Sequence, residues 1–197
     1  MTMNITCGTI RAERFELVDS ASRSRATMEM TPAGTPALSL MDEAGGVRLS
    51  LRLLPNGASQ ALLLDEQGRR RMTISLSGRG VPMVHLADET GTPRAILHLL
   101  ADGSPHVGFY DEAGTERLTT GLADGCEPSV SMCDASGDVR LAAGVMGDGT
   151  PGLHMYDEAG QRKIDATVLS NGQAQLHVDG QGTSQPIYTL PLFDSRA

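Results

Sequence analysis

The chain has no tryptophan, and aromatic residues make up only 3% of its 197 residues although 40% are hydrophobic. A conventional globular core usually contains more aromatic mass than this. Its three cysteines, Cys7, Cys126 and Cys133, are too few and odd in number for a disulfide framework. The sequence contains neither the apolar run that a membrane helix needs nor the apolar stretch of a signal peptide. We therefore expect a cytoplasmic protein by default, with leaderless secretion or a place in a phage particle left open.

Positive charge is also scarce, since the formal net charge is -8. Non-specific binding to nucleic acid needs a basic face that displaces counterions from the phosphates. The composition therefore argues against nucleic acid as a partner, and the lack of an apolar span argues against a membrane.

What the sequence does contain is a repeat of 23 residues. An aspartate recurs at this interval and is followed by a cation six residues later. The aspartates are Asp19, Asp42, Asp65, Asp88, Asp111, Asp134 and Asp157, and the cations are Arg25, Arg48, Arg71, Arg94, Arg117, Arg140 and Lys163. Glycine usually follows the aspartate by three residues, and a second glycine series precedes a proline, so that one repeat reads LxLxDxxGxxRxxLxLLxDGxP. We predict an N-terminal cap over residues 1–13, seven to eight repeats over 14–182, and a C-terminal cap or docking tail over 183–197.

Apolar and polar residues alternate on both sides of each aspartate. Leu38 and Leu40 precede Asp42, for example, and Leu49 and Leu51 follow it. A period of two is typical of half-buried strands, and no segment shows the 3.6-residue period of a helix. The predicted fold is all-β, a long antiparallel meander of tandem β-hairpins with roughly 14–16 short strands.

Two kinds of turn join these strands. The first is Asp-Glu-Ala-Gly in three copies, and the second centres on Asn-Gly or Asp-Gly. An even loop at the first turn would place Leu38 opposite Leu49. An odd loop at the second turn, such as a type I turn with a G1 bulge, would place Leu51 opposite Ala61. One even and one odd loop keep the apolar side chains on one face and account for the odd repeat length.

That apolar face has to be hidden, because each buried Leu, Val or Met contributes about 1.5–3 kcal/mol. No predicted helix can cover it, so the sheet must curl, fold into two layers or associate with copies of itself. The small and medium side chains suit a narrow interior such as the axis of a trimeric β-prism. We therefore expect a homo-oligomer, with a trimer favoured, and a monomeric solenoid of 23-residue coils as the alternative.

The aspartates could form a ladder of cation sites, but calcium loops place several oxygen ligands close together, as in DxDxDG. We interpret DxxG as a turn in which the aspartate caps its own backbone. The cation series could bind anions, but glutamates on the same turns favour solvated charge pairing. These glutamates are Glu43, Glu66, Glu89, Glu112 and Glu158.

Histidine and cysteine are the remaining candidates for chemistry. His85 and His154 share one repeat position, and the inferred second turn places His98 opposite His106. Such a pair can ligate a metal, but a third ligand is missing, so we interpret it as an ordinary exposed pair. The thiols form no CxxC motif. We predict no catalytic, cofactor-binding or metal-binding residues and no cofactor.

At Tyr110-Asp-Glu-Ala-Gly and Tyr156-Asp-Glu-Ala-Gly the chain resembles the YD repeats of RHS-type proteins, which use a YDxxG hairpin in long β arrays. Over residues 13–182 it is similar to uncharacterised bacterial LxLxDxxGxxR/DGxP β-hairpin repeat proteins. The resemblance implies a β-hairpin array, and it implies no activity or binding residue.

The motifs GxSxG, HExxH and the Walker loop are absent, as is GxGxxG before a helix. Repetition itself argues against an enzyme, because catalysis needs one asymmetric group of residues. The predicted function is a non-catalytic structural or assembly scaffold that self-associates. The alternative is a protein- or glycan-binding module of the fibre or adhesin type.

Overall fold

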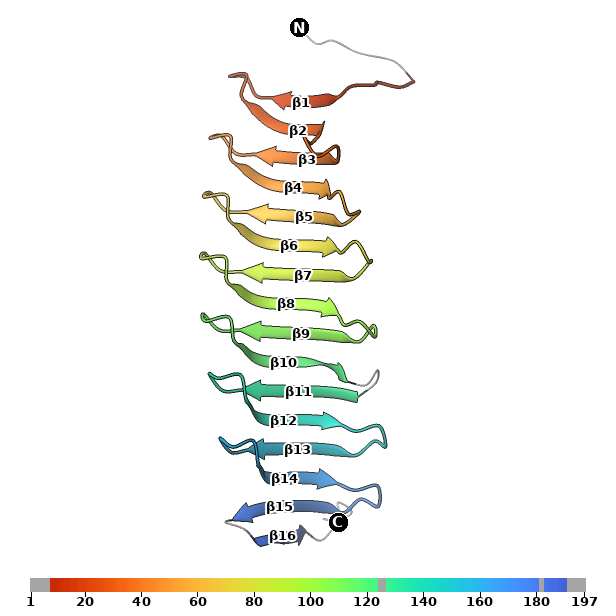
Figure 1. Ribbon diagram of the computed structural model, residues 1–197, viewed down its shortest axis with the longest axis vertical. Helices are drawn as coiled ribbons and strands as arrows, with labels where there is room; N and C mark the ends of the chain where they lie inside the picture. Colours follow the sequence, from red (N-terminus) through yellow and green to blue (C-terminus); the bar gives the residue numbers. More distant parts are fainter. Residues whose placement is uncertain (1–7, 124–126, 181–182, 191–197) are drawn as a thin grey trace, which may run out of the picture. The chain divides into compact units, whose positions relative to one another are not determined.

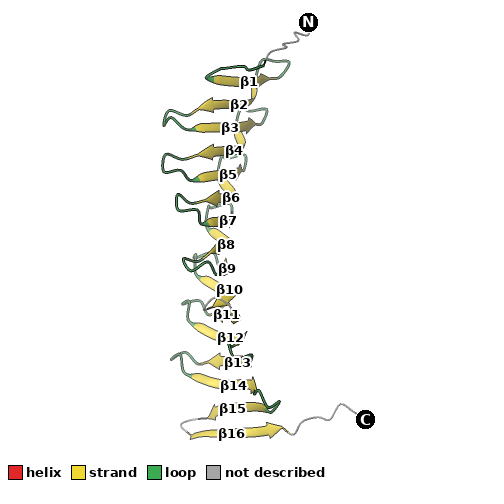
Figure 2. Cartoon of the chain, turned by 90° about the vertical axis from the view of Figure 1, so that its right-hand side faces the viewer, coloured by secondary structure: helices red, strands yellow, loops and turns green. Residues whose placement is uncertain are grey.

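The computed structural model describes residues 8–123, 127–180 and 183–190. Within these ranges the chain forms sixteen β-strands and no helix (Figure 2). The chain divides into two compact units, Met1–Gly80 and Val81–Ala197. The predicted all-β fold is confirmed.

The first unit contains six strands, each paired antiparallel with the next one along the chain (Figure 1). They are β1 (Arg14–Val18), β2 (Ser24–Met30), β3 (Pro36–Met41), β4 (Val47–Leu53), β5 (Ser59–Leu64) and β6 (Arg70–Leu76). The unit is therefore a meander of hairpins, as the repeat predicts.

The second unit continues the same pattern with ten strands. They are β7 (Pro82–Ala87), β8 (Pro93–Leu99), β9 (Pro105–Tyr110), β10 (Glu116–Ala123), β11 (Glu127–Cys133), β12 (Val139–Val145), β13 (Pro151–Tyr156), β14 (Arg162–Val168), β15 (Ala174–Gly180) and β16 (Thr183–Leu190). The predicted C-terminal tail thus begins with a strand, β16, that pairs with β15. Residues 191–197 lie outside the described residues.

The turn between β4 and β5 has the predicted odd loop. The N–H of Leu54 donates to the carbonyl of Ala58 at 2.8 Å, and the N–H of Gly57 donates to the carbonyl of Leu54 at 2.9 Å. Gly57 has a φ of 82°, which a side chain would disfavour. This is a type I turn with a G1 bulge. Leu51 lies opposite Ala61, as predicted.

The Asp-Glu-Ala-Gly turn between β3 and β4 differs from the prediction in its register. Leu49 lies opposite Leu40 rather than Leu38. The ladder shifts just before the turn, because Met41 pairs with Val47 and Arg48 is left as an extra residue in β4. The predicted even loop is wrong, because the loop is odd. A bulge at the cation of the repeat follows it and restores the even spacing that keeps the apolar side chains on one face.

Neither sheet is closed within its unit. The described strands of each unit pair only with their neighbours in sequence, so they form hairpins side by side rather than the coils of a solenoid. Leu51 in the first unit and Leu97 in the second are each 46% exposed. Within each unit, the described residues therefore leave these apolar side chains uncovered, and neither unit forms a closed prism.

Candidate functional site

The surface that stands out is the apolar face of the second unit, defined here by the side chains that β7–β15 direct to one side of the sheet. Cross-strand pairing aligns these side chains in rows that run perpendicular to the strands. The central row is Val84, Leu97, Val107, Thr120, Val130, Ala143, Leu153, Ala166 and Leu176. The row beside it is Leu86, Ala95, Phe109, Leu118, Met132, Leu141, Met155, Ile164 and Val178. Neither row contains a charged residue.

Four of these side chains, including Leu86 at 42%, remain close to half exposed. Leu97 is 46% exposed, Phe109 42% and Met132 47%. Exposed apolar residues are ordinary when they are scattered, but contiguous patches beyond a few hundred Å² mark interaction surfaces. The rows make this patch contiguous, so the face is a candidate interaction surface.

The apolar face is hollowed where short side chains alternate with long ones. Ala166 on β14 lies between Leu153 on β13 and Leu176 on β15. A hollow of about 440 Å³ opens there, lined also by Val168 and Ala174. It has the shape and chemistry to receive an apolar side chain from another molecule.

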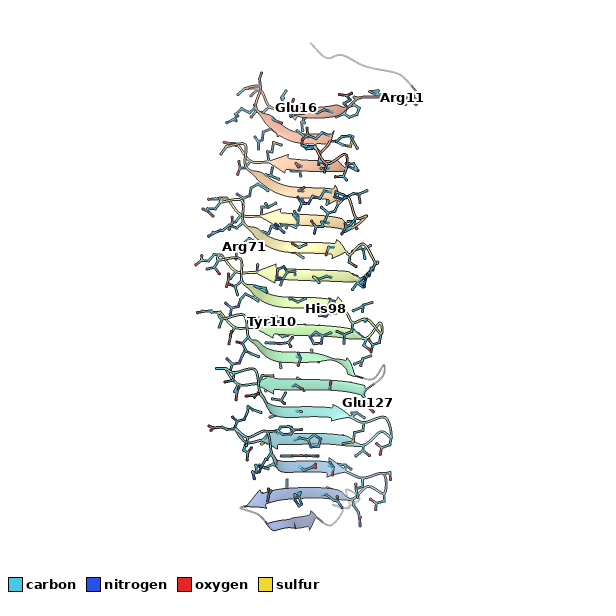
Figure 3. The ribbon with its side chains drawn as sticks, in the orientation of Figure 1. Arg11, Glu16, Arg71, His98, Tyr110 and Glu127 are labelled. Atoms are coloured by element: carbon cyan, nitrogen blue, oxygen red, sulfur yellow. The ribbon has the colours of Figure 1, made fainter. Side chains whose placement is uncertain are left out.

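The opposite face carries polar and titratable groups. His98 on β8 lies opposite His106 on β9, as predicted, and their ring centroids are 5.0 Å apart. His106 Nε2 lies 3.1 Å from Glu116 Oε1. Burial raises the pKa of Tyr110, and the hydrogen bond with Glu116 adds to this. Figure 3 shows His98 and Tyr110 toward opposite ends of the neighbouring strands β8 and β9.

Gly108 explains how this polar group fits the sheet. A Cβ at this position would overlap Glu116 Oε1 and would lie 2.8 Å from the hydroxyl of Tyr110. The missing side chain therefore leaves the space that Glu116 and Tyr110 occupy.

A second polar row lies further along the same unit. Asp165 on β14 is flanked in register by His154 on β13 and His177 on β15. Its Oδ1 lies 3.3 Å from His154 Nδ1, and its Oδ2 accepts a hydrogen bond from Arg162 at 2.8 Å. Sequence reasoning missed this row, although His154 and Asp165 pair across the same kind of turn as the other repeats. Across the described part of the chain, no three His, Cys, Asp or Glu side chains are grouped so as to hold a metal ion.

The repeated aspartates cap their turns, as interpreted from the sequence. Asp42 Oδ1 accepts hydrogen bonds from the N–H groups of Ala44 at 2.9 Å and Gly46 at 2.8 Å. The same two bonds recur in the other six copies. The bond from Gly46 lowers the pKa of Asp42, since hydrogen bonds to a carboxylate favour its charged form.

The repeated cations contact these aspartates rather than the glutamates that the sequence suggested. All seven lie 3.2 to 3.8 Å from the aspartate of their own turn. Arg48 also donates from Nε to the carbonyl of Leu64, at 3.0 Å, on the neighbouring strand. The same bond to the next repeat is made by Arg25, Arg94, Arg117 and Arg140. The bulge explains why the arginines do not contact the glutamates as expected, because it brings each arginine beside the next Asp turn.

No family model matches the chain, and no curated protein matches it. Among solved structures, the chain is similar to the TCP domain of SAS-4 (dCPAP) from Drosophila melanogaster, in complex with a proline-rich motif of Ana2. The identity is 12%, the TM-score is 0.48, and the match covers 91% of this chain and 99% of that one. The wild-type TCP10 domain of CPAP from Danio rerio matches at 13% identity and a TM-score of 0.28, covering 77% of this chain and 83% of that one.

The remaining sequence candidates are dispersed. Cys133 ends β11, and burial raises the pKa of its thiol. Cys7 and Cys126 lie outside the described residues. His85 shares its repeat position with His154 but lies on β7, and its Nε2 is buried without a hydrogen-bond partner among the described residues. Within those residues, the structure has no helix of the length and apolar character that crossing a membrane requires.

Proposed function

We propose that this chain is a non-catalytic scaffold of β-hairpin repeats that self-associates through its apolar face. The observation that carries the proposal is the contiguous, charge-free face of β7–β15, on which Leu97 and Met132 remain nearly half exposed. Burying such side chains releases free energy in proportion to the apolar area removed from water.

The size of the face matches what a stable interface needs. Nine strands spaced about 4.8 Å apart, each about 20 Å long, give a face of roughly 800 Å². This is about the area that one partner contributes to an interface of standard size.

The face is also complementary to itself. Because it has no charge, two copies bring no like charges together. At the end of the central row, Ala143, Leu153, Ala166 and Leu176 alternate short and long side chains, so a leucine of one copy can enter the hollow above Ala166 of another. A face-to-face dimer and the trimeric prism favoured by the sequence both bury this surface, and the mass of the assembly distinguishes them.

The test is the mass of the intact chain, measured by size-exclusion chromatography with light scattering at micromolar concentration. We expect a dimer or trimer for the natural sequence. Leu97→Glu places a charge within the apolar face and should weaken association roughly 100-fold or more, since an unpaired charge is costly to bury. Ser131→Glu is the matched control, because it adds the same charge on the opposite face of β11, away from the hollow, and should leave the mass unchanged. A natural chain that stays monomeric at every concentration would refute self-association.

A second candidate function is a protein-binding module, which the hollow beside Ala166 favours. In that case the natural chain is a monomer that binds an apolar fluorescent probe in the hollow with defined stoichiometry. Ala166→Leu, which fills the hollow, should abolish binding of the probe while the chain stays folded.

A further inference from the structure

The first strand presents a bare edge. All five residues of β1 are exposed, including Phe15 at 39% and Leu17 at 64%. β2 pairs with one side of β1, and among the described residues no strand pairs with its other side. Edge strands are commonly protected by charged side chains, proline or a bulge. The β1 sequence, RFELV, contains no proline, and its two charges, Arg14 and Glu16, are of opposite sign and can pair with the same residues of a second copy.

The backbone groups that face outward from this edge can be assigned. The N–H of Asp19 donates to the carbonyl of Arg23 at 3.0 Å, so the backbone of Asp19 points toward β2. The N–H and C=O groups of successive residues in a strand point alternately to its two sides. The extra residue of the bulge in this hairpin, Arg25, lies in β2, so the alternation along β1 is unbroken. The backbone groups of Arg14 and Glu16 therefore point outward, away from β2.

We propose that β1 pairs antiparallel with β1 of a second copy, across a two-fold axis at Phe15. This edge contact uses a surface distinct from the apolar face and does not depend on the proposed function. Each outward-facing Arg14 then lies opposite Glu16 of the other copy and exchanges backbone hydrogen bonds with it.

Charge selects this register. Arg14 already lies 3.1 Å from Glu16 of its own strand and 3.6 Å from Glu29 on β2 (Figure 3 shows Glu16 on β1). With the axis at Phe15, each arginine has a glutamate as its neighbour both along its own strand and across the pair. An axis at Glu16 would oppose two glutamates, and an axis at Arg14 would oppose two arginines, which destabilises a strand pair.

The apolar rows also continue across the proposed edge. Phe15 lies opposite Met28, whose partner on β3 is Leu38. Phe15 of one copy would meet Phe15 of the other on the same face, at a position without backbone hydrogen bonds where side chains approach closely. The edge-to-edge pair would therefore join this apolar row of the first unit to the same row of a second copy.

Disulfide trapping tests the pairing and its register together. Across the axis, Phe15→Cys places two Cα atoms about 4.5 Å apart, within the range that a disulfide spans. The matched control, Leu17→Cys, is on the same face, but its two copies are four residues out of register, roughly 14 Å apart. Both variants also carry Leu97→Glu and serine in place of Cys7, Cys126 and Cys133, so that neither the apolar face nor a natural thiol contributes.

Mild oxidation at micromolar concentration should link most of the Phe15→Cys chain as a dimer and leave the Leu17→Cys chain unlinked. Equal linking of the two variants, or linking of neither while circular dichroism shows an intact sheet, overturns the proposal. Because Leu97→Glu disables the apolar face throughout, failure here is distinguishable from failure of the proposed function.

Charge exchange provides the second test. In the Phe15→Cys chain, Arg14→Glu leaves only glutamates at the edge, and Glu16→Arg leaves only arginines. Each variant alone should link several-fold less, and a mixture of the two should recover the original yield as a mixed dimer. A mixture that links no better than its components overturns the register.

Discussion

The two turns that flank β9 have the same backbone form but differ in how far their contacts reach. In the turn from β8 to β9, Gly103 has a φ of 89°, and Asp102 accepts bonds from the N–H of Ser104 at 2.9 Å and its hydroxyl at 3.0 Å. Every one of these side-chain contacts stays within the turn.

The turn from β9 to β10 contains Gly114 with a φ of 81°, and Asp111 accepts bonds from two backbone N–H groups. Asp111 Oδ2 also accepts from Arg117 Nη1 at 3.2 Å. Arg117 in turn donates from Nε to the carbonyl of Cys133, at 2.9 Å, just before the next Asp turn.

The difference shows how the repeats are held to one another. At the second-turn end of the strands, the turn from β8 to β9 closes only its own hairpin, whereas in the turn from β12 to β13 the N–H of Gly147 donates to Glu127 Oε1 at the start of β11. At the Asp-turn end, the arginine at the bulge contacts both the aspartate of its own turn and the strand that leads into the next Asp turn. The backbone does not run directly between these two turns. A unit without a closed core therefore has, along one side of the sheet, a series of charged contacts that repeats with the sequence.

Acid should produce the largest change at the Asp-turn end. All seven capping aspartates have a lowered pKa, and the hydroxyl of Thr90, which donates to Asp88, lowers the pKa of Asp88 to about 2. Between the ordinary value of 3.8 and about 2, the unfolded chain binds more protons than the folded one. The free energy of unfolding should thus be constant above about pH 5 and fall steeply from pH 4 to pH 2.

Urea denaturation at a series of pH values measures this slope. Asp88→Asn keeps an oxygen that can accept the backbone bonds but removes the charge, so its slope should be shallower than that of the natural chain. A free energy of unfolding that is the same at pH 5 and pH 2.5 would contradict the prediction.

The sequence predicted the second turn more completely than the first for a physical reason. An odd loop with glycine at positive φ admits one common geometry, so Leu51 opposite Ala61 and His98 opposite His106 followed directly. At the first turn, parity led us to expect an even loop with Leu38 opposite Leu49, but an odd loop with one bulged residue satisfies the same parity. The extra residue, Arg48, lies in the ladder instead of the loop, which moves the register by two residues.

The sequence predicted which residues form the apolar face, but it did not predict what covers that face or which groups the repeated arginines contact. Alternation along the strands identified the apolar face, because the side-chain period of a strand is two. Whether that face is covered depends on what binds to it, and no local pattern in the sequence encodes a binding partner. The partner of each arginine was missed because Leu64, which Arg48 contacts, is 16 residues away and becomes a neighbour only through the bulge.

Replacing the turn-capping aspartate of either turn with alanine should reduce the free energy of unfolding less than acid does. Asp111→Ala removes two backbone bonds and the contact with Arg117, whereas Asp102→Ala removes one backbone bond and one hydroxyl bond. We expect the loss in unfolding free energy for Asp111→Ala to be roughly twice that for Asp102→Ala. Thermal unfolding followed by circular dichroism compares the two variants, and equal losses would show that the connection to the next turn adds no stability.

The smallest predicted effect concerns the one copy that departs from the turn pattern. Ser22 occupies the place of the glycine and has a φ of 60°, although its N–H still donates to the carbonyl of Asp19 at 3.0 Å. A left-handed residue with a side chain costs about 1–2 kcal/mol, and glycine loses about 0.5–1 kcal/mol more entropy on folding. Ser22→Gly should therefore stabilise the chain by about 0.5 kcal/mol, measured by urea denaturation. Gly45→Ser, at the equivalent position of the next repeat, has open space around it and a φ of 83°, so it should lose about as much as Ser22→Gly gains. A gain at both positions, or a loss at both, would mean that the strained φ does not determine the stability of this turn.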